Sequence, residues 1–154
     1  MSAAPAPGTL VPAAVRHRVE HVDIDASGVV HFARHASLLE TAALTNLDRL
    51  GAGIDVLAGL GLDLVVADLR MRYHAPARFL DHLDLAVDVL HVGAASFRLS
   101  GRISRVPSGP EAEPQVLSTG VFVFGVAGRA CGTARPLPEK LRTQLKECRR
   151  HADT

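Results

Sequence analysis

Two aspartates, Asp23 and Asp25, stand in a short polar segment directly before an apolar pattern of helical period. The first amides of a helix have no partner inside it and carry a partial positive charge, so they can stabilise an oxyanion. From this position Asp25 can attack a substrate carbonyl or deprotonate an attacking water, with backbone amides near His31 and Phe32 as the oxyanion site. The ordinary use of an aspartate before a helix is a turn or a cap, and Asp23 fits that use.

Other catalytic and metal-binding arrangements are weakly represented. His31 and His35 are four residues apart, as metal ligands on a helix can be, but the sequence offers no clear third ligand, and we expect no metal. Cys131 and Cys148 are too few for a disulfide framework or a four-sulfur zinc site. The sequence also lacks the Gly-x-Ser-x-Gly elbow of serine hydrolases and a glycine-rich phosphate loop. We therefore expect catalysis without a cofactor.

The composition is typical of one soluble domain. The chain has 154 residues and a mass of 16.3 kDa, and its 17 basic and 16 acidic side chains leave no basic field for nucleic acid. No apolar run is long enough to cross a bilayer, and no secretory signal is visible, so we expect a cytoplasmic protein with no membrane partner. The predicted organisation is a disordered Ala- and Pro-rich tail over 1–14, one domain over 15–148 and a flexible end over 149–154.

The elements that must position Asp25 begin with a strand and a long helix. Residues 15–22 alternate with period two and predict a strand, and residues 23–28 predict a turn. After the turn, apolar residues recur every three or four positions and predict a helix of about five turns that ends at Gly51. This apolar stripe consists of Phe32, Ala36, Leu39, Ala43, Leu47 and Leu50.

The rest of the chain mostly has the period of strands, and the four segments concerned can form an antiparallel meander. The sheet must bury its apolar face, and the alanine-rich helix is the only sizeable partner. We therefore predict an α+β fold, the hotdog fold, in which a curved antiparallel sheet wraps around one long central helix. The predicted elements are strands over 69–74, 83–90, 97–105 and 117–126, a tight hairpin at 92–95, an exposed loop at 107–114 and a terminal helix over 138–147.

Two motifs resemble those of the hotdog-fold thioesterases of the 4-hydroxybenzoyl-CoA type and of the acyl-CoA thioesterases of bacterial Tol-Pal clusters. The first runs from Val22 to Phe32, with an Asp-x-Asp, a glycine and a valine before the helix. The second is Tyr73-His74-Ala75-Pro76-Ala77-Arg78, followed by Asp81. The resemblance covers about residues 15–126. It implies a hydrolase that converts an acyl thioester of CoA, or of acyl-carrier protein, into the free acid.

The resemblance also implies roles for single residues. Asp25 occupies the place of the family's catalytic aspartate, and Gly28 is expected beside it for the shape of the turn. In a second lineage of this fold a helical glutamate supplies the carboxylate, which makes Glu40 the alternative to Asp25. The plain interpretation of Glu40 is a hydrogen-bonded or partly exposed carboxylate on the helix. We expect His35 to pack at the helix entry or to line the substrate cleft.

Three arginines, Arg78, Arg102 and Arg105, are candidates for binding the phosphates of CoA, since a planar guanidinium suits phosphate. The other interpretation of Arg102 is a solvated sheet face. Some relatives instead carry basic residues on the third hairpin, where this chain has the uncharged run 93–97. This difference keeps open a second substrate class, an acyl group on a carrier protein of polyketide or fatty-acid biosynthesis.

Proteins of this fold pair through their edge strands, so the resemblance implies a homodimer or a tetramer with the cleft between subunits. Two other functions stay open at this point. A hydratase or dehydratase would need a histidine–acid pair, such as His31 with Asp25 or Glu40. A domain that binds acyl thioesters without turnover would require no chemistry of Asp25 or of the helix entry.

Overall fold

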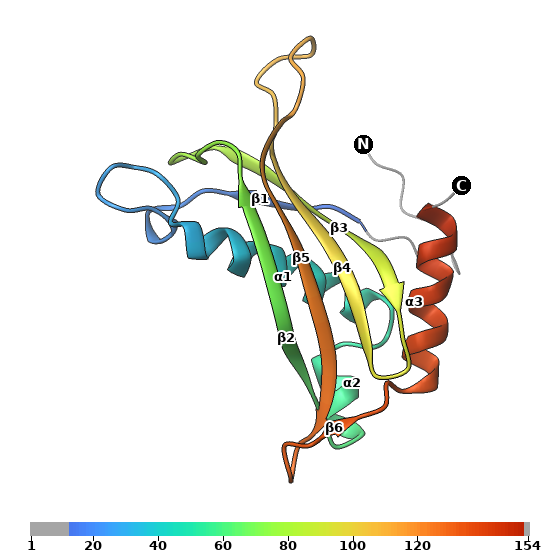
Figure 1. Cartoon of the computed structure of the whole chain (residues 1–154). Coiled ribbons are helices and arrows are strands. Elements are labelled where there is room, and N and C mark those ends of the chain that lie inside the picture. The colour runs from blue at the N-terminus through green and yellow to red at the C-terminus, as the bar shows by residue number, and fades with distance from the viewer. Residues whose placement is uncertain (1–12, 153–154) are drawn as a thin grey trace.

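One long helix precedes most of a curled antiparallel sheet in the chain and lies against it in space (Figure 1). The structure is a computed structural model and describes residues 13–152. No helix among these residues is long and apolar enough to cross a membrane. In chain order the elements are β1 (Val15–Arg18), the 3-10 helix η1 (His21–Asp23), α1 (Phe32–Arg49), α2 (Ile54–Gly59), β2 (Leu62–Tyr73), β3 (His82–Val92), β4 (Ser96–Arg105), β5 (Gln115–Gly128), β6 (Ala134–Arg135) and α3 (Glu139–Ala152).

The strands form one sheet in the order β1-β3-β4-β5-β2, with the short β6 beside β5. Strands β3, β4 and β5 are consecutive, as in the predicted meander. The meander is wrong for β2, which pairs with β5 at the far edge of the sheet and not with β3. The connection 74–81 explains the difference, because its backbone bonds to Val19 and Val30 instead of closing a hairpin.

Two strand boundaries differ from the predicted ones, because hydrogen bonds formed in the fold, and not the alternating pattern alone, decide where a strand begins and ends. β1 ends at Arg18, since residues 21–23 turn into η1, where the Asp23 carboxylate accepts the Glu20 amide at 2.8 Å. β2 begins at Leu62, well before the predicted start at residue 69. The elements α2 and β6 have no counterpart among the predicted ones.

The ends of the chain also differ from the predicted organisation. α3 continues to Ala152 and so includes residues 149–152, which the sequence predicts to be flexible. Of the predicted tail over 1–14, residues 1–12 lie outside the described residues. Ala13 exchanges two backbone–side-chain hydrogen bonds with Asn46 of α1, at 2.8 and 3.0 Å. The folded unit therefore begins at least two residues before the predicted start.

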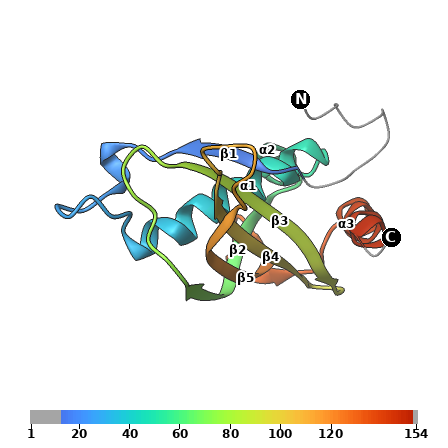
Figure 2. The same ribbon diagram turned by 90° about the horizontal axis from the view of Figure 1, so that it is seen from above.

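A pair of glycines lets α1 approach the sheet closely (Figure 2). Gly101 of β4 and Gly120 of β5 are directly paired, and both face Leu39, whose side chain is completely buried. A Cβ added at Gly101 would lie only 2.9 Å from Cδ1 of Leu39, so the missing side chain is what makes room for the helix. Phe32 is an exception to the predicted apolar stripe. It is 73% exposed, because it belongs to the first turn of α1, outside the helix–sheet contact.

We expect Gly101→Ala to lower the free energy of unfolding by about 1–3 kcal/mol, because the new methyl group overpacks a fully buried leucine. Urea unfolding measures the effect, and the loss should shrink when Leu39→Ala is already present. Gly125→Ala is the matched control, since its added Cβ would meet only the Ala95 carbonyl oxygen at 3.5 Å, an ordinary contact. An equal loss for both alanine variants would contradict this account of the packing.

Candidate active site

Asp25 lies on a small hairpin that leads directly into α1. Ile24 and Val30 pair as an isolated antiparallel bridge, and the chain reverses between them. The Gly28 amide donates to the Asp25 carbonyl at 3.1 Å, and the φ of Gly28, +83°, is one that residues with a side chain rarely adopt. Gly28 therefore shapes the turn. Both overall views show the hairpin projecting beyond the N-terminal end of α1 (Figures 1 and 2).

One oxygen of the Asp25 carboxylate is held in place and the other is free. Oδ1 accepts hydrogen bonds from the Ser27 hydroxyl, the Ser27 amide at 2.9 Å and the Val29 amide at 3.3 Å. Oδ2 has no hydrogen-bond partner among the described residues, and the side chain is exposed. The hydrogen bonds from Ser27 keep the pKa of Asp25 below its ordinary value of 3.8. At neutral pH the group is therefore an ionised carboxylate with one oxygen available for chemistry.

The two motifs singled out in the sequence lie side by side. Val29 of the hairpin pairs with Arg78 as an isolated bridge, and the Phe79 amide donates to the Gly28 carbonyl at 3.1 Å. The segment 74–81 is therefore hydrogen-bonded to the Asp25 hairpin, although the two are some fifty positions apart in the sequence.

The first turn of α1 offers two amides, those of Phe32 and Ala33, that have no hydrogen-bond partner among the described residues. The His31 amide is different, because it donates to the Asp23 carbonyl at 3.1 Å. Of the two amides predicted to form the oxyanion site, that of His31 is thus engaged within the chain, and that of Phe32 has no partner in the described part of the chain. The sequence analysis did not single out Ala33. Its amide lacks a helical partner because the helix starts at Phe32, a boundary that only the structure gives.

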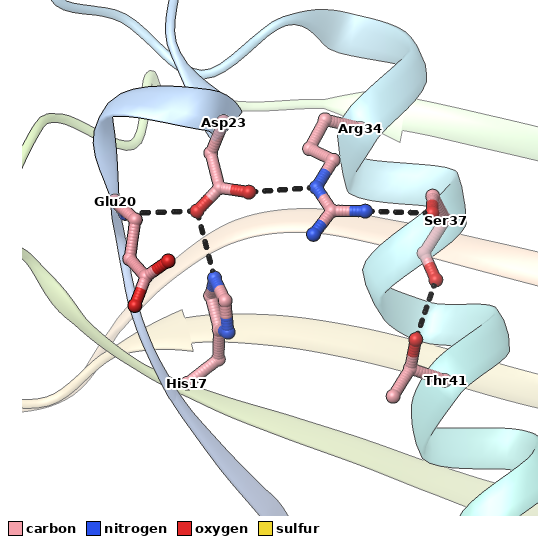
Figure 3. Close-up of polar contacts among 6 residues, drawn as sticks. All are labelled: His17, Glu20, Asp23, Arg34, Ser37 and Thr41. Atoms are coloured by element: carbon pink, nitrogen blue, oxygen red, sulfur yellow. Dashed lines mark hydrogen bonds and ion pairs between the residues drawn. The ribbon is translucent and has the colours of Figure 1, made fainter.

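Asp23 is the centre of a buried polar network that ties this region together (Figure 3). Its carboxylate accepts Arg34 Nε at 2.7 Å and the Glu20 amide at 2.8 Å, and it lies 2.9 Å from His17 Nε2. Burial raises the pKa of Asp23, but the hydrogen bonds from Glu20, His17 and Arg34 outweigh burial and lower it to about 2. Asp23 thus joins β1, η1 and the first turn of α1, in keeping with the turn or capping role expected for it.

Tyr73 covers the start of α1 from the end of β2. Its hydroxyl donates to the Phe32 carbonyl at 2.7 Å, and its ring meets the Phe32 ring edge-on with centroids 6.4 Å apart. His35 lies on the other side of Tyr73, at a centroid distance of 5.3 Å, and its Nδ1 is 2.8 Å from the Ser118 hydroxyl. Since His35 is 3% exposed, it packs at the helix entry, which is one of the two roles expected for it. Burial lowers its pKa.

Glu40 is not brought to the hairpin. It lies on α1 seven positions after Ala33, which corresponds to about 11 Å along the helix axis. Its side chain is half-buried and makes no hydrogen bond or ion pair within the described part of the chain. Within one chain, the hairpin that carries Asp25 leads directly into the first turn of α1, whereas Glu40 lies about two turns further along the helix.

The three arginines predicted to bind phosphate lie in different surroundings. Arg78 is exposed and belongs to the segment that pairs with the Asp25 hairpin. Arg102 points to the opposite face of the sheet from Leu39, where it lines an open hollow of about 470 Å³ together with Arg70 and Arg72. Arg105 donates to the chain itself, including Asp81 at 3.0 Å. Of the three, the fold brings only Arg78 close to Asp25 with its guanidinium unengaged.

Across residues 13–152, no three His, Cys, Asp or Glu side chains converge in a way that could hold a metal ion. His31 and His35, the pair with helical spacing, do not face a common point, since His31 is exposed and His35 is buried beneath Tyr73. Besides Ala33, the sequence analysis also missed the role of Tyr73 at this site. Its place in the second motif was the only available signal, because the contact with Phe32 depends on the sheet topology.

We predict that Asp23→Asn lowers the free energy of unfolding at pH 7 by about 2–4 kcal/mol, because the variant loses the charged hydrogen bonds of a buried carboxylate. The pKa of Asp23 is lower in the folded chain, about 2, than its ordinary 3.8, so the wild type loses about 2 kcal/mol of stability as pH falls through this interval. Denaturant unfolding from pH 7 to pH 2 should therefore show the two proteins converging below pH 4.

Asp63→Asn is the control for this experiment, since Asp63 is 52% exposed and pairs with Arg129 on the surface at 3.3 Å. Its effect should stay below about 1 kcal/mol at every pH. A difference between wild type and Asp23→Asn that does not change with pH would contradict the assignment of the low pKa to Asp23.

The sequence and the fold are similar to those of known proteins. The profile of the thioesterase-like superfamily matches residues 19–145. No curated protein sequence matches the chain. Among solved structures, a 1,4-dihydroxy-2-naphthoyl-CoA thioesterase from Synechocystis is 20% identical, with a TM-score of 0.75 over 86% of this chain and 94% of that one. The dynemicin thioesterase is 23% identical, with a TM-score of 0.75 and coverages of 86% and 94%. YbaW, a probable thioesterase from Escherichia coli, is 23% identical, with a TM-score of 0.69 and coverages of 88% and 97%.

The similarity to these structures confirms the hotdog fold that the hydrophobic patterns predict. The matched span contains the Asp25 hairpin, all of α1 and the segment 74–81, so it includes both motifs that carry the resemblance. The chain belongs to the thioesterase-like superfamily.

Proposed function

We propose that this protein hydrolyses an acyl thioester to the free acid, with Asp25 as the carboxylate and the amides of Phe32 and Ala33 as the oxyanion site. The observation that carries the proposal concerns residues 13–152: one oxygen of the Asp25 carboxylate has no hydrogen-bond partner among them, and neither have two amides of the helix that the Asp25 hairpin enters. The Ile24–Val30 bridge joins the two arms of that hairpin, so Asp25 lies only a few residues before the start of α1.

In this proposal the thioester carbonyl oxygen accepts hydrogen bonds from Phe32 and Ala33, and negative charge develops on it when the carbonyl carbon is attacked. Oδ2 of Asp25 either attacks that carbon, giving an anhydride that water then cleaves, or takes a proton from the attacking water. In both routes the C–S bond breaks, the sulfur leaves as a thiolate that takes up a proton, and the acyl group leaves as a carboxylic acid. Each oxyanion donor contributes about 10²–10³ and a base about 10²–10⁴ in rate.

Arg78 supports CoA as the carrier of the acyl group. Its backbone is fixed beside Val29 and its guanidinium is exposed, so it can form a bidentate contact with a phosphate. The Synechocystis protein of the same fold is named as a CoA thioesterase, in agreement with this choice. The uncharged hairpin at 93–96 and the likeness to the dynemicin thioesterase make an acyl-carrier protein the second substrate class to test.

A second copy of the chain is the partner that would enclose the site. β2 is the last strand of the sheet, and its outer edge is unpaired within the described residues. An exposed apolar edge strand normally needs protection, and here Tyr73 at its end reaches the start of α1. Two β2 edges joined about a two-fold axis would cover this surface and close both sites. The side chains of β2 that are more than a third exposed include Val65 (43%), Val66 (38%), Leu69 (37%) and Tyr73 (46%).

We expect Asp25→Asn to lower kcat by at least about 10²-fold, because an amide neither attacks the carbonyl carbon nor accepts a proton from water. Release of free thiol from a panel of acyl-CoA esters and from an acyl-carrier protein measures the rate. Glu40→Gln, tested in parallel, should keep most of the activity.

The same assay decides between the alternatives. Activity that survives in Asp25→Asn and disappears in Glu40→Gln would move the carboxylate to α1. Release from the carrier protein without release from any CoA ester would replace CoA by the carrier. Binding of thioesters with no release from either would leave a binding domain and overturn the proposed hydrolysis.

The dimer is tested by Leu69→Glu on β2. A charge on this edge should prevent pairing, so light scattering should show a monomer, and the rate should fall at least about tenfold while the circular dichroism stays unchanged. Leu90→Glu on β3 is the matched control, since Leu90 is 45% exposed and β3 is separated from β2 by two strands. A wild-type monomer with full activity would refute the role of the second copy.

A further inference from the structure

Arg105, at the end of β4, donates side-chain hydrogen bonds to three different residues of the chain. Nε donates to the Asp81 carboxylate at 3.0 Å, one terminal nitrogen donates to the Pro76 carbonyl at 2.7 Å, and the other donates to Gln115 Oε1 at 2.6 Å. Two of these acceptors lie on the segment 74–81. The guanidinium therefore fastens both ends of that segment's turn to the sheet.

The turn that Arg105 holds has a conformation that local sequence does not favour. Leu80 has a φ of +71°, in the left-handed region that side chains rarely adopt. Such a residue persists where its surroundings fix it. Here the Asp81 carboxylate accepts the Arg78 amide at 2.8 Å, and the Leu80 amide donates to the Val19 carbonyl at 3.1 Å. Arg105 binds the same oxygen of Asp81 that receives the Arg78 amide.

From this turn the hydrogen bonds continue to the catalytic hairpin. The Val30 amide donates to the Ala77 carbonyl at 2.9 Å, and the Phe79 amide donates to the Gly28 carbonyl at 3.1 Å. These two bonds bracket residues 28–30, which form the returning arm of the Asp25 hairpin. The Val29 amide of that arm is one of the donors to the Asp25 carboxylate. Hydrogen bonds and the short backbone segments between them thus connect Arg105 to Asp25.

The bonds of Arg105 also argue against its binding a phosphate of CoA. All three of its nitrogens already donate within the chain, and its side chain is only 30% exposed. A phosphate could replace these acceptors only by releasing the turn. The exposed and unengaged Arg78 is the better phosphate ligand of the two.

We propose that Arg105 is a positioning residue, which holds the Asp25 hairpin against the start of α1 through Asp81 and the turn 76–81. The inference rests on the proposed function of Asp25, and it assigns no contact between Arg105 and the substrate. A carboxylate displaced by about 1 Å can lose about 10²-fold in rate. We therefore expect Arg105→Gln to lower kcat about 10- to 100-fold while KM for acyl-CoA changes less than about threefold.

Two further measurements separate positioning from a general loss of stability. Arg105→Lys, which keeps the charge but reaches fewer acceptors, should recover part of kcat. Hydrogen exchange of the Val30 and Phe79 amides should become at least about tenfold faster in Arg105→Gln at a temperature well below unfolding. Arg98→Gln is the control, because Arg98 is an exposed arginine of the same strand with no hydrogen bond in the described chain, and both readouts should match the wild type.

Each result decides the inference. A raised KM with unchanged kcat and unchanged amide exchange would make Arg105 a substrate ligand and overturn the positioning role. Wild-type kcat and exchange in Arg105→Gln would overturn it as well. If Arg105→Gln does not fold, Arg105→Lys and Asp81→Asn carry the same comparison. Absence of hydrolysis in the wild type would refute the proposed function alone, because the exchange of Val30 and Phe79 still shows whether Arg105 holds the hairpin.

Discussion

The buried carboxylate of Asp23 is the interaction on which the placement of the site depends. It joins Arg34 of α1 to His17 of β1. The carboxylate itself is shielded from solvent, in surroundings where an unpaired charge would be strongly unfavourable, so its two partly exposed partners are held in place around it. The Asp23 carbonyl also accepts a hydrogen bond from the His31 amide, and the next two amides, of Phe32 and Ala33, have no partner within residues 13–152. The apolar stripe alone would form a helix, but it would not fix the direction from which the hairpin enters it.

Asp23 and Asp25 show how one residue type acquires two roles within three positions. Asp23 points into the chain, where charged and backbone donors saturate both of its oxygens. Asp25 lies beyond the Ile24–Val30 bridge, on the exposed side of the hairpin, where only one oxygen is occupied and the donors are neutral. Both are ionised at neutral pH, yet only Asp25 has a lone pair that a substrate or a water molecule can reach. Surroundings, rather than intrinsic acidity, separate the structural carboxylate from the one proposed to act in catalysis.

The site lies at the border of the folded chain because α1 is longer than its contact with the sheet. The middle of the helix packs closely on the strands, where Leu39 contacts the paired glycines Gly101 and Gly120. The first turn extends past this contact, and Tyr73, which contacts it, is itself 46% exposed. A core that ends there leaves the free amides open to a substrate, and it also leaves apolar edge surface for a second chain to bury. The middle of α1 thus contributes to stability, and its first turn leaves the amides accessible.

The sequence by itself determined the elements that local periodicity and turn chemistry can encode. The helical stripe and the glycine at its end predict α1 to within two residues, and the turn before it contains the carboxylate that the structure leaves exposed. Only the tertiary structure decided that β2 occupies the far edge, that the His31 amide is consumed by Asp23, and that Arg105 is bound to the 76–81 turn. These three features depend on contacts between residues far apart in the chain. The hydrophobic period of a sequence shows which face of a helix or strand a residue lies on. It does not show which other element packs against that face, so it carries no signal for such contacts.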